Sequence, residues 1–187
     1  MGSWVPGLTL GMDRRTARIF RAVAAALVLV TAAYHLWWGF PRSLVYLAAV
    51  GNGVPPDPRP FLFVALGLLL LAGPYLVSFD VISLRTAYAG ATLLLVGSIA
   101  AWVTWHATGH GAFLVDGFSA PGSGGDGHSH GSTVFLILDH FNTEPVEAAI
   151  KLIETAAVVV FVTLLWRDPA IVPRERGESE RSDASET

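Results

Sequence analysis

Histidines carry the first chemical signal in this sequence, because two of them stand four residues apart in WHATGHG, residues 105–111. Positions four apart share one face of a helix, so His106 and His110 could bind one metal ion if the helix continues through Gly109. Further ligands would come from the other histidines or a nearby carboxylate: His35, His128, His130, His140 and Asp139.

The residue types restrict what such a site could hold. The chain has no cysteine, which excludes disulfides, thiolate zinc sites, iron–sulfur clusters and cysteine nucleophiles. Histidine and carboxylate ligands suit zinc or copper(II) better than copper(I). Bis-histidine haem b is a narrower alternative, with His35 and His106 as the axial pair. Two plainer interpretations stay open: the histidines anchor helix ends at the interface, or the HSH loop binds metals only weakly.

A charged face near the C-terminus is the second signal. Glu147, Lys151 and Glu154 follow one another at helical spacing inside an apolar stretch. A charge at membrane depth costs at least ~2.5–3.5 kcal/mol unless it is paired or hydrated, so this face should turn toward the bundle or a water-filled pocket. The plainer interpretation is that Lys151 only neutralises the two glutamates.

The inner halves of the apolar stretches contain no ionisable residue before their ends. This pattern favours an outward-open polar pocket over a continuous ion pathway. The sequence also contains no phosphate-binding loop, no recognisable serine–histidine–acid arrangement and no HExxH helix, so we predict no catalytic residue.

The elements that must position these residues are four membrane-spanning helices. The chain is 52% hydrophobic and only 14% charged, and crossing a bilayer takes roughly 20 apolar residues. Suitable stretches are 17–40, 60–79, 86–108 and 145–166. We expect the first to be retained rather than cleaved as a signal peptide, because it exceeds the ~7–15 apolar residues of such peptides. The predicted domains are a cytoplasmic segment 1–16, a transmembrane domain 17–168 and a disordered acidic tail 169–187.

The connections carry their own signals. Residues 43–50 are too short to span, and we expect them to lie separately at the interface. Residues 109–132 are glycine-rich and predict a flexible loop, and 133–141 either lie on the surface or enter the bundle. Asn142 or Thr143 should cap the fourth helix, with Pro145 in its first turn.

Small residues predict how the helices pack. Gly90, Gly97 and Ala101 form one stripe on the third helix, which would let a neighbouring backbone approach closely. A four-helix bundle is the economical arrangement.

Positive residues predict the orientation, because arginine and lysine beside membrane helices are retained in the cytoplasm. One side carries Arg14, Arg15, Arg18, Arg21, Arg85, Arg167, Arg174, Arg176 and Arg181; the other carries Arg42, Arg59 and Lys151. We therefore predict an all-α integral membrane bundle in the cell membrane, with both termini cytoplasmic and a long extracytoplasmic loop between the third and fourth helices. All six histidines then lie on the outer side.

The order of features resembles a group of uncharacterised small four-helix membrane proteins of halophilic archaea. The similar segments are YHLWWGF, FLFVALGLLLLAG, LRTAYAGATLLLVGSIAAWVTW and VEAAIKLIETAAVVVFVTLLWRD, together with the excess of arginine over lysine and the acidic tail. The resemblance covers roughly residues 17–168 and implies no established function. The histidine-bearing loop 109–132 and DHFNTEP depart from that pattern.

The leading functional hypothesis is a non-enzymatic membrane protein that binds a ligand, such as a divalent metal, or serves as an accessory subunit at the outer face. One alternative is a haem- or copper-binding subunit of a membrane redox complex, using His35, His106, His110 and His140. Another is a small transporter using Glu147, Lys151 and Glu154. The expected partners are the lipid bilayer and either a second copy or a larger membrane complex. The net charge of −3 gives no indication of nucleic-acid binding.

Overall fold

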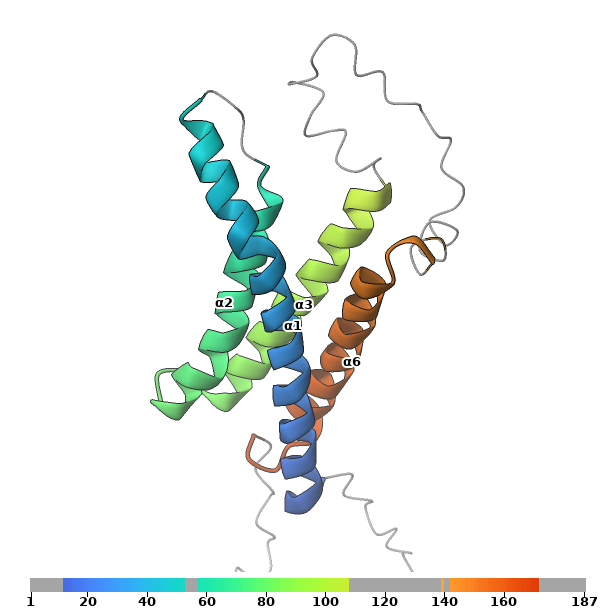
Figure 1. The fold of residues 1–187 in the computed structure, drawn as a ribbon. Coiled ribbons are helices and arrows are strands. Elements are labelled where there is room, and N and C mark those ends of the chain that lie inside the picture. Colours follow the sequence, from blue (N-terminus) through green and yellow to red (C-terminus); the bar gives the residue numbers. More distant parts are fainter. Residues whose placement is uncertain (1–11, 53–56, 108–138, 140–141, 172–187) are drawn as a thin grey trace, which may run out of the picture.

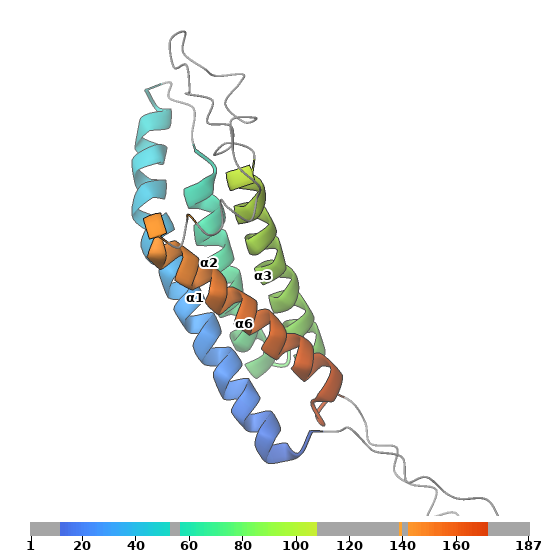
Figure 2. The same ribbon diagram turned by 90° about the vertical axis from the view of Figure 1, so that its right-hand side faces the viewer.

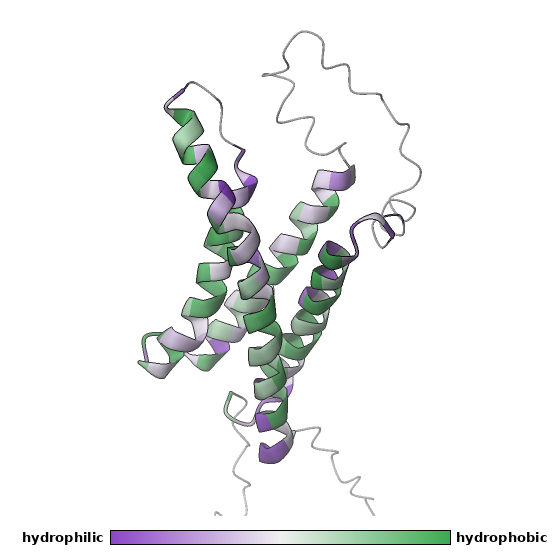
Figure 3. Ribbon diagram, in the orientation of Figure 1, coloured by the Kyte–Doolittle hydropathy of each residue, from purple (hydrophilic) through white to green (hydrophobic). Residues whose placement is uncertain are grey.

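A computed structural model describes residues 12–52, 57–107, 139 and 142–171, and this part of the chain contains four long helices (Figure 1). They are α1 (Arg14–Val50), α2 (Arg59–Ser78), α3 (Leu84–Ala107) and α6 (Pro145–Arg167). All four are long and apolar enough to cross a membrane. Hydrophobic residues occupy most of the length of each helix (Figure 3). The predicted all-α fold with four such helices is confirmed. The loop 109–132, most of 133–141 and the tail after residue 171 lie outside the described residues.

The four helices form a ring in which each packs against two neighbours. Helix α1 contacts α2 and α6, and α3 contacts the same two helices from the opposite corner. The contact between α1 and α2 is the most extensive and that between α2 and α3 the least. In Figure 1 the α1–α2 pair and the α3–α6 pair diverge toward the end where α1 finishes, and Figure 2 shows α6 crossing in front of α1.

Helix α1 corrects one prediction, because residues 43–50 are not a separate segment. The helix continues through Pro41 to Val50 and has 37 residues, about 55 Å at 1.5 Å per residue. A proline is tolerated inside a membrane helix, because neighbouring groups compensate for the missing hydrogen bond. The residues after Pro41 are compatible with a helix, and Ser43 is buried. Helix α1 therefore extends beyond a hydrocarbon core about 30 Å thick.

The start of α6 corrects a second prediction. Its N-cap residue is Glu144, which makes no side-chain capping bond, rather than Asn142 or Thr143. Pro145 fixes the first helical position and has no N–H that needs a partner, which sets the boundary without a polar cap. The hydroxyl of Thr143 instead donates a hydrogen bond to the carbonyl of Asp139 at 3.1 Å.

Close helix packing involves different glycines from those predicted. A Cβ added at Gly39 would lie 2.7 Å from the carbonyl oxygen of Pro60, and one at Gly67 would lie 2.8 Å from Cγ of Leu36. These two glycines let α1 and α2 approach closely. By contrast, a Cβ at Gly90 or Gly97 would meet nothing within 4 Å, so the stripe on α3 faces open space.

A cluster of polar side chains joins the helices at the end of the bundle where α1 begins and α6 finishes. Asp168, directly after α6, is fully buried and accepts hydrogen bonds from Nε of Arg21 at 2.8 Å and from the hydroxyl of Tyr88 at 3.1 Å. Burial alone would raise the pKa of Asp168, but the bonds from Arg21, the Ala170 N–H and Tyr88 together lower it below its ordinary 3.8. The cluster therefore joins α1, α3 and the end of α6.

We expect Asp168→Asn to lower the free energy of unfolding by about 1–3 kcal/mol, because Arg21 and Tyr88 lose a buried charged acceptor. The folded pKa is depressed, so the contribution of Asp168 is present above pH 3.8 and is lost as the pH falls through the lower folded pKa. Thermal unfolding in detergent at neutral and acid pH measures both effects. Asp80→Asn, at an exposed position, is the matched control, and equal unfolding midpoints for the two variants would contradict the prediction.

Candidate functional site

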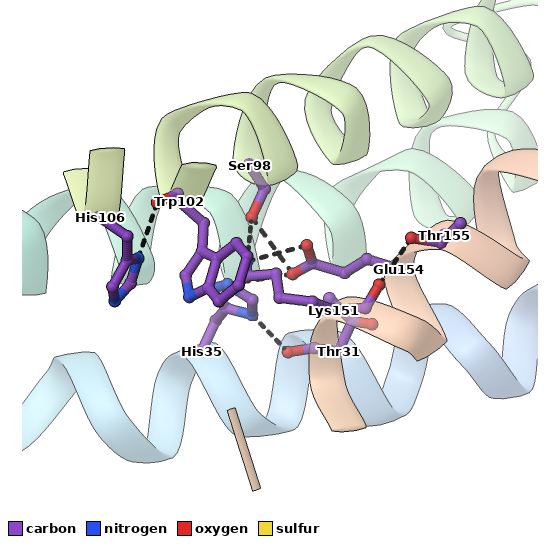
Figure 4. A network of polar contacts seen from close by, with 8 residues as sticks. All are labelled: Thr31, His35, Ser98, Trp102, His106, Lys151, Glu154 and Thr155. Atoms are coloured by element: carbon purple, nitrogen blue, oxygen red, sulfur yellow. Dashed lines mark hydrogen bonds and ion pairs between the residues drawn. The ribbon is translucent and has the colours of Figure 1, made fainter. Parts of the chain in front are cut away.

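A closed network of polar side chains lies inside the bundle (Figure 4). The ammonium of Lys151 donates hydrogen bonds to Oε2 of Glu154 and to the hydroxyl of Ser98, each at 2.9 Å. That hydroxyl in turn donates to Oε1 of Glu154 at 3.2 Å. Glu154 is completely buried and Lys151 is 9% exposed. The network links α6 to α3 and gives both charges compensating partners without water.

The sequence of α6 explains why these groups meet there. Lys151 and Glu154 are three residues apart, so one helical face carries both. Glu154 is about 14 Å along α6 from Pro145 at 1.5 Å per residue, close to the middle of the helix. A charge at this depth must face the interior of the bundle. The burial of Glu154 agrees with the expectation that the charged face turns inward.

His35 of α1 lies against the same carboxylate. Its Nδ1 is 2.8 Å from the carbonyl oxygen of Thr31, and its Nε2 is 3.4 Å from Oε1 of Glu154. The imidazole is fully buried and packs beside the ring of Phe63, with 4.8 Å between ring centroids. His35 therefore brings α1 into contact with the network of α3 and α6.

The two nitrogens of His35 have different proton requirements. A carbonyl oxygen can only accept, so Nδ1 must carry a hydrogen. Nε2 then either carries a second hydrogen that points at Glu154 or directs its lone pair at a carboxylate oxygen. The two side chains are complementary only when a proton lies between them. His35 and Glu154 thus form a buried pair with room for one shared proton.

A cavity of about 820 Å³ adjoins the network at the end of the bundle where α1 and α3 finish and α6 begins. Its aromatic wall consists of Tyr34, Trp38, Phe63, Trp102 and Trp105. Its other polar side chains belong to Arg59, Ser98, Thr104, His106, Glu144, Glu147 and Lys151. Because Lys151 and Ser98 belong to both features, the cavity and the buried network share a wall.

His106 lies at this cavity and is held in the same way as His35. Its Nδ1 is 2.8 Å from the carbonyl oxygen of Trp102, and the centroids of the two rings are 4.7 Å apart. Its exposed fraction is 9%, so the imidazole lies inside the bundle rather than in lipid. A histidine whose Nδ1 donates to a backbone carbonyl presents Nε2, the arrangement common among metal ligands.

The structure separates the predicted site residues. His106, Glu147 and Lys151 line the cavity, whereas His35 and Glu154 are buried behind it. Four predicted site residues lie outside the described residues: His110, His128, His130 and His140. The predicted pairing of His106 with His110 on one metal ion therefore stays a prediction. In the described ranges, no three histidine, aspartate or glutamate side chains are arranged to hold a metal ion. A zinc, copper or haem site therefore stays a prediction.

Sequence reasoning missed Ser98, Thr31 and Arg59. Ser98 could have been found from its spacing, because Ser98, Trp102 and His106 recur at every fourth position of α3. Thr31 and His35 have the same spacing on α1. Arg59 joins the cavity because α2 begins there, and its guanidinium lies 4.2 Å from the centroid of Trp105.

The contribution of the Lys151–Glu154 ion pair to stability can be measured by removing its charges singly and together. Lys151→Met or Glu154→Leu alone should lower the free energy of unfolding by roughly 3–5 kcal/mol, because each leaves an uncompensated buried charge. The double variant should recover most of this loss, since it removes both charges together. Thermal unfolding in detergent measures all three, with the exposed Arg85→Met as the control for loss of a cation. A double variant as unstable as the sum of the two single variants would count against the pair.

The protonation of His35 is open to direct measurement. In the folded protein, ¹⁵N NMR should show His35 either as the imidazolium or as the neutral form protonated at Nδ1, because the Thr31 carbonyl requires a donor. His35→Gln identifies its signals by their loss. A neutral His35 protonated at Nε2 would contradict the assignment.

Comparisons of the chain with models of protein families, with characterised proteins and with solved structures found no match. The resemblance to small membrane proteins of halophilic archaea therefore stays a prediction.

Proposed function

We propose that this chain is a non-enzymatic membrane protein that binds a small ligand in the cavity at the α1–α3 end of the bundle. One observation supports this most strongly: the cavity of about 820 Å³ shares Lys151 with a buried charged network. Intramembrane ionisable residues that face a cavity are functional candidates by default.

The lining has the composition of a ligand site. Such sites have volumes of about 300–1,000 Å³ and combine apolar and aromatic walls with a small number of polar groups. Here tryptophan, phenylalanine and leucine side chains surround the cavity, and its polar groups come from α2, α3, α6 and the residue before α6. In the predicted orientation the cavity faces outward. A ligand would then reach it from the outside without crossing the inner half of the bundle.

Transport is the second candidate, and a separate cavity favours it. A space of about 420 Å³ lies in the other half of the bundle, and Leu94 lines both cavities. The two spaces follow the contact between α2 and α3, which is the least extensive in the ring. A route across the bundle would require Leu94, which lines both spaces, to move.

The haem and copper alternatives receive less support from the geometry. Axial ligation by His35 and His106 needs both imidazoles to face one space, but only His106 lines the cavity. The Nε2 atom of His35 already faces Glu154 at 3.4 Å. We therefore do not include a redox cofactor in the proposed function.

The absence of cysteine makes accessibility simple to measure. Gly97→Cys places a thiol in the cavity, where an added Cβ meets nothing within 4 Å. A membrane-impermeant maleimide added to the outer face of cells should label this thiol, because a ligand cavity open to that side contains water. Val96→Cys, one residue away and 46% exposed on the outer surface of the bundle, should stay unlabelled in lipid.

Labelling of Gly97→Cys from the outer face alone supports the binding protein. Labelling from both faces, tested in inverted vesicles, would favour the transporter over the binding protein. If the thiol at position 97 reacts from neither face, or no faster than the thiol at position 96, both the binding function and the transport function are contradicted.

A further inference from the structure

The cations on the cavity wall already have partners. Lys151 is paired with Glu154, and Arg59 forms a two-pronged ion pair with Asp57, its Nε lying 2.8 Å from Oδ2 and 3.0 Å from Oδ1. Neither Glu154 nor Asp57 lines the cavity. The positive charges of the wall are therefore balanced by carboxylates that do not line the cavity.

The acidic groups on the wall come from α6 and the residue before it. Glu147 is half-buried and lines the cavity together with Glu144. An anionic ligand would have to approach Glu147 and compete with Glu154 or Asp57 for its cation. A cationic ligand needs neither change, so the ion pairs of the wall favour a positive charge.

The aromatic wall favours the same sign of charge. Aromatic faces attract cations through their quadrupole, most strongly when the cation is an organic group that sheds water easily. Two tryptophans of this wall already show the interaction within the chain: Arg59 lies over Trp105 and Arg42 over Trp38, at 4.2 and 4.3 Å from the ring centroids. Tyr34, Phe63 and Trp102 supply further aromatic surface around the cavity.

We propose that the cavity binds an organic cation, such as an amine or quaternary onium ion with apolar substituents, with its charge near Glu147 and its substituents against the aromatic wall. This inference rests on the proposed function and names the class of ligand. An inorganic metal ion fits less well, because the described residues offer no three suitably arranged ligands. An organic cation needs only one carboxylate and aromatic contact.

Two probes of nearly equal size and opposite charge test the proposal: tetraphenylphosphonium and tetraphenylborate. Binding to the full chain in lipid nanodiscs is measured by isothermal calorimetry and tryptophan fluorescence, with empty nanodiscs subtracted because both ions enter lipid. We expect the phosphonium to bind at least about tenfold more tightly than the borate. Glu147→Gln should weaken phosphonium binding at least about tenfold, an energy of about 1.4 kcal/mol.

A matched variant separates contact from general surface charge. Asp139→Asn removes an exposed carboxylate shortly before α6 and should leave the affinity for the phosphonium unchanged. The unfolding midpoint of Glu147→Gln verifies that it folds, and Glu147→Asp should retain part of the affinity.

Borate binding as tight as phosphonium binding would overturn the inference, as would full phosphonium affinity in a folded Glu147→Gln protein. Binding of neither probe would also overturn it. The proposed function is tested independently of this inference, since labelling of Gly97→Cys from the outer face depends on the cavity and not on the charge of its ligand.

Discussion

The buried pair of Lys151 and Glu154 is the interaction on which the rest of this structure depends. Two charges near the middle of a membrane helix are tolerated only if the protein itself compensates them. Ser98 of α3 satisfies one hydrogen bond of each partner, and His35 of α1 faces the same carboxylate. The requirement to shelter one ion pair therefore fixes which faces of three helices meet at this level of the bundle.

The uneven packing of the ring follows from side-chain size as well as from charge. Helices α1 and α2 meet backbone to backbone because Gly39 and Gly67 have no side chain at their contact. Between α2 and α3 the same residue type has the opposite effect, since Gly90 and Gly97 border cavities rather than a neighbouring backbone. A tightly packed pair beside a loosely packed contact provides a rigid wall with open space next to it.

Hydropathy and charge spacing were enough to predict the four helices and the inward face of α6, because both depend on local sequence and on the cost of charge in lipid. They were not enough to place the glycines of α3, since whether a glycine meets a backbone depends on the partner helix. The separate segment predicted at 43–50 was wrong for a related reason: α1 continues past Pro41, where Gly39 lies against Pro60 of α2 and Ser43 is buried. His35 could be predicted as an intramembrane histidine, but its contact with Glu154 depends on the angle between α1 and α6.

Lys151 connects the two parts of the site. Lys151 lines the cavity, and its ammonium binds Glu154, whose other oxygen faces His35. If a ligand displaced this ammonium, Glu154 would keep only Ser98 and His35 as polar neighbours, and a proton taken up between Glu154 and His35 would then replace the lost positive charge. A buried carboxylate responds to the loss of one counter-ion by holding another or a proton more firmly. Occupancy of the cavity would then be linked to protonation behind its wall through the side chain of Lys151.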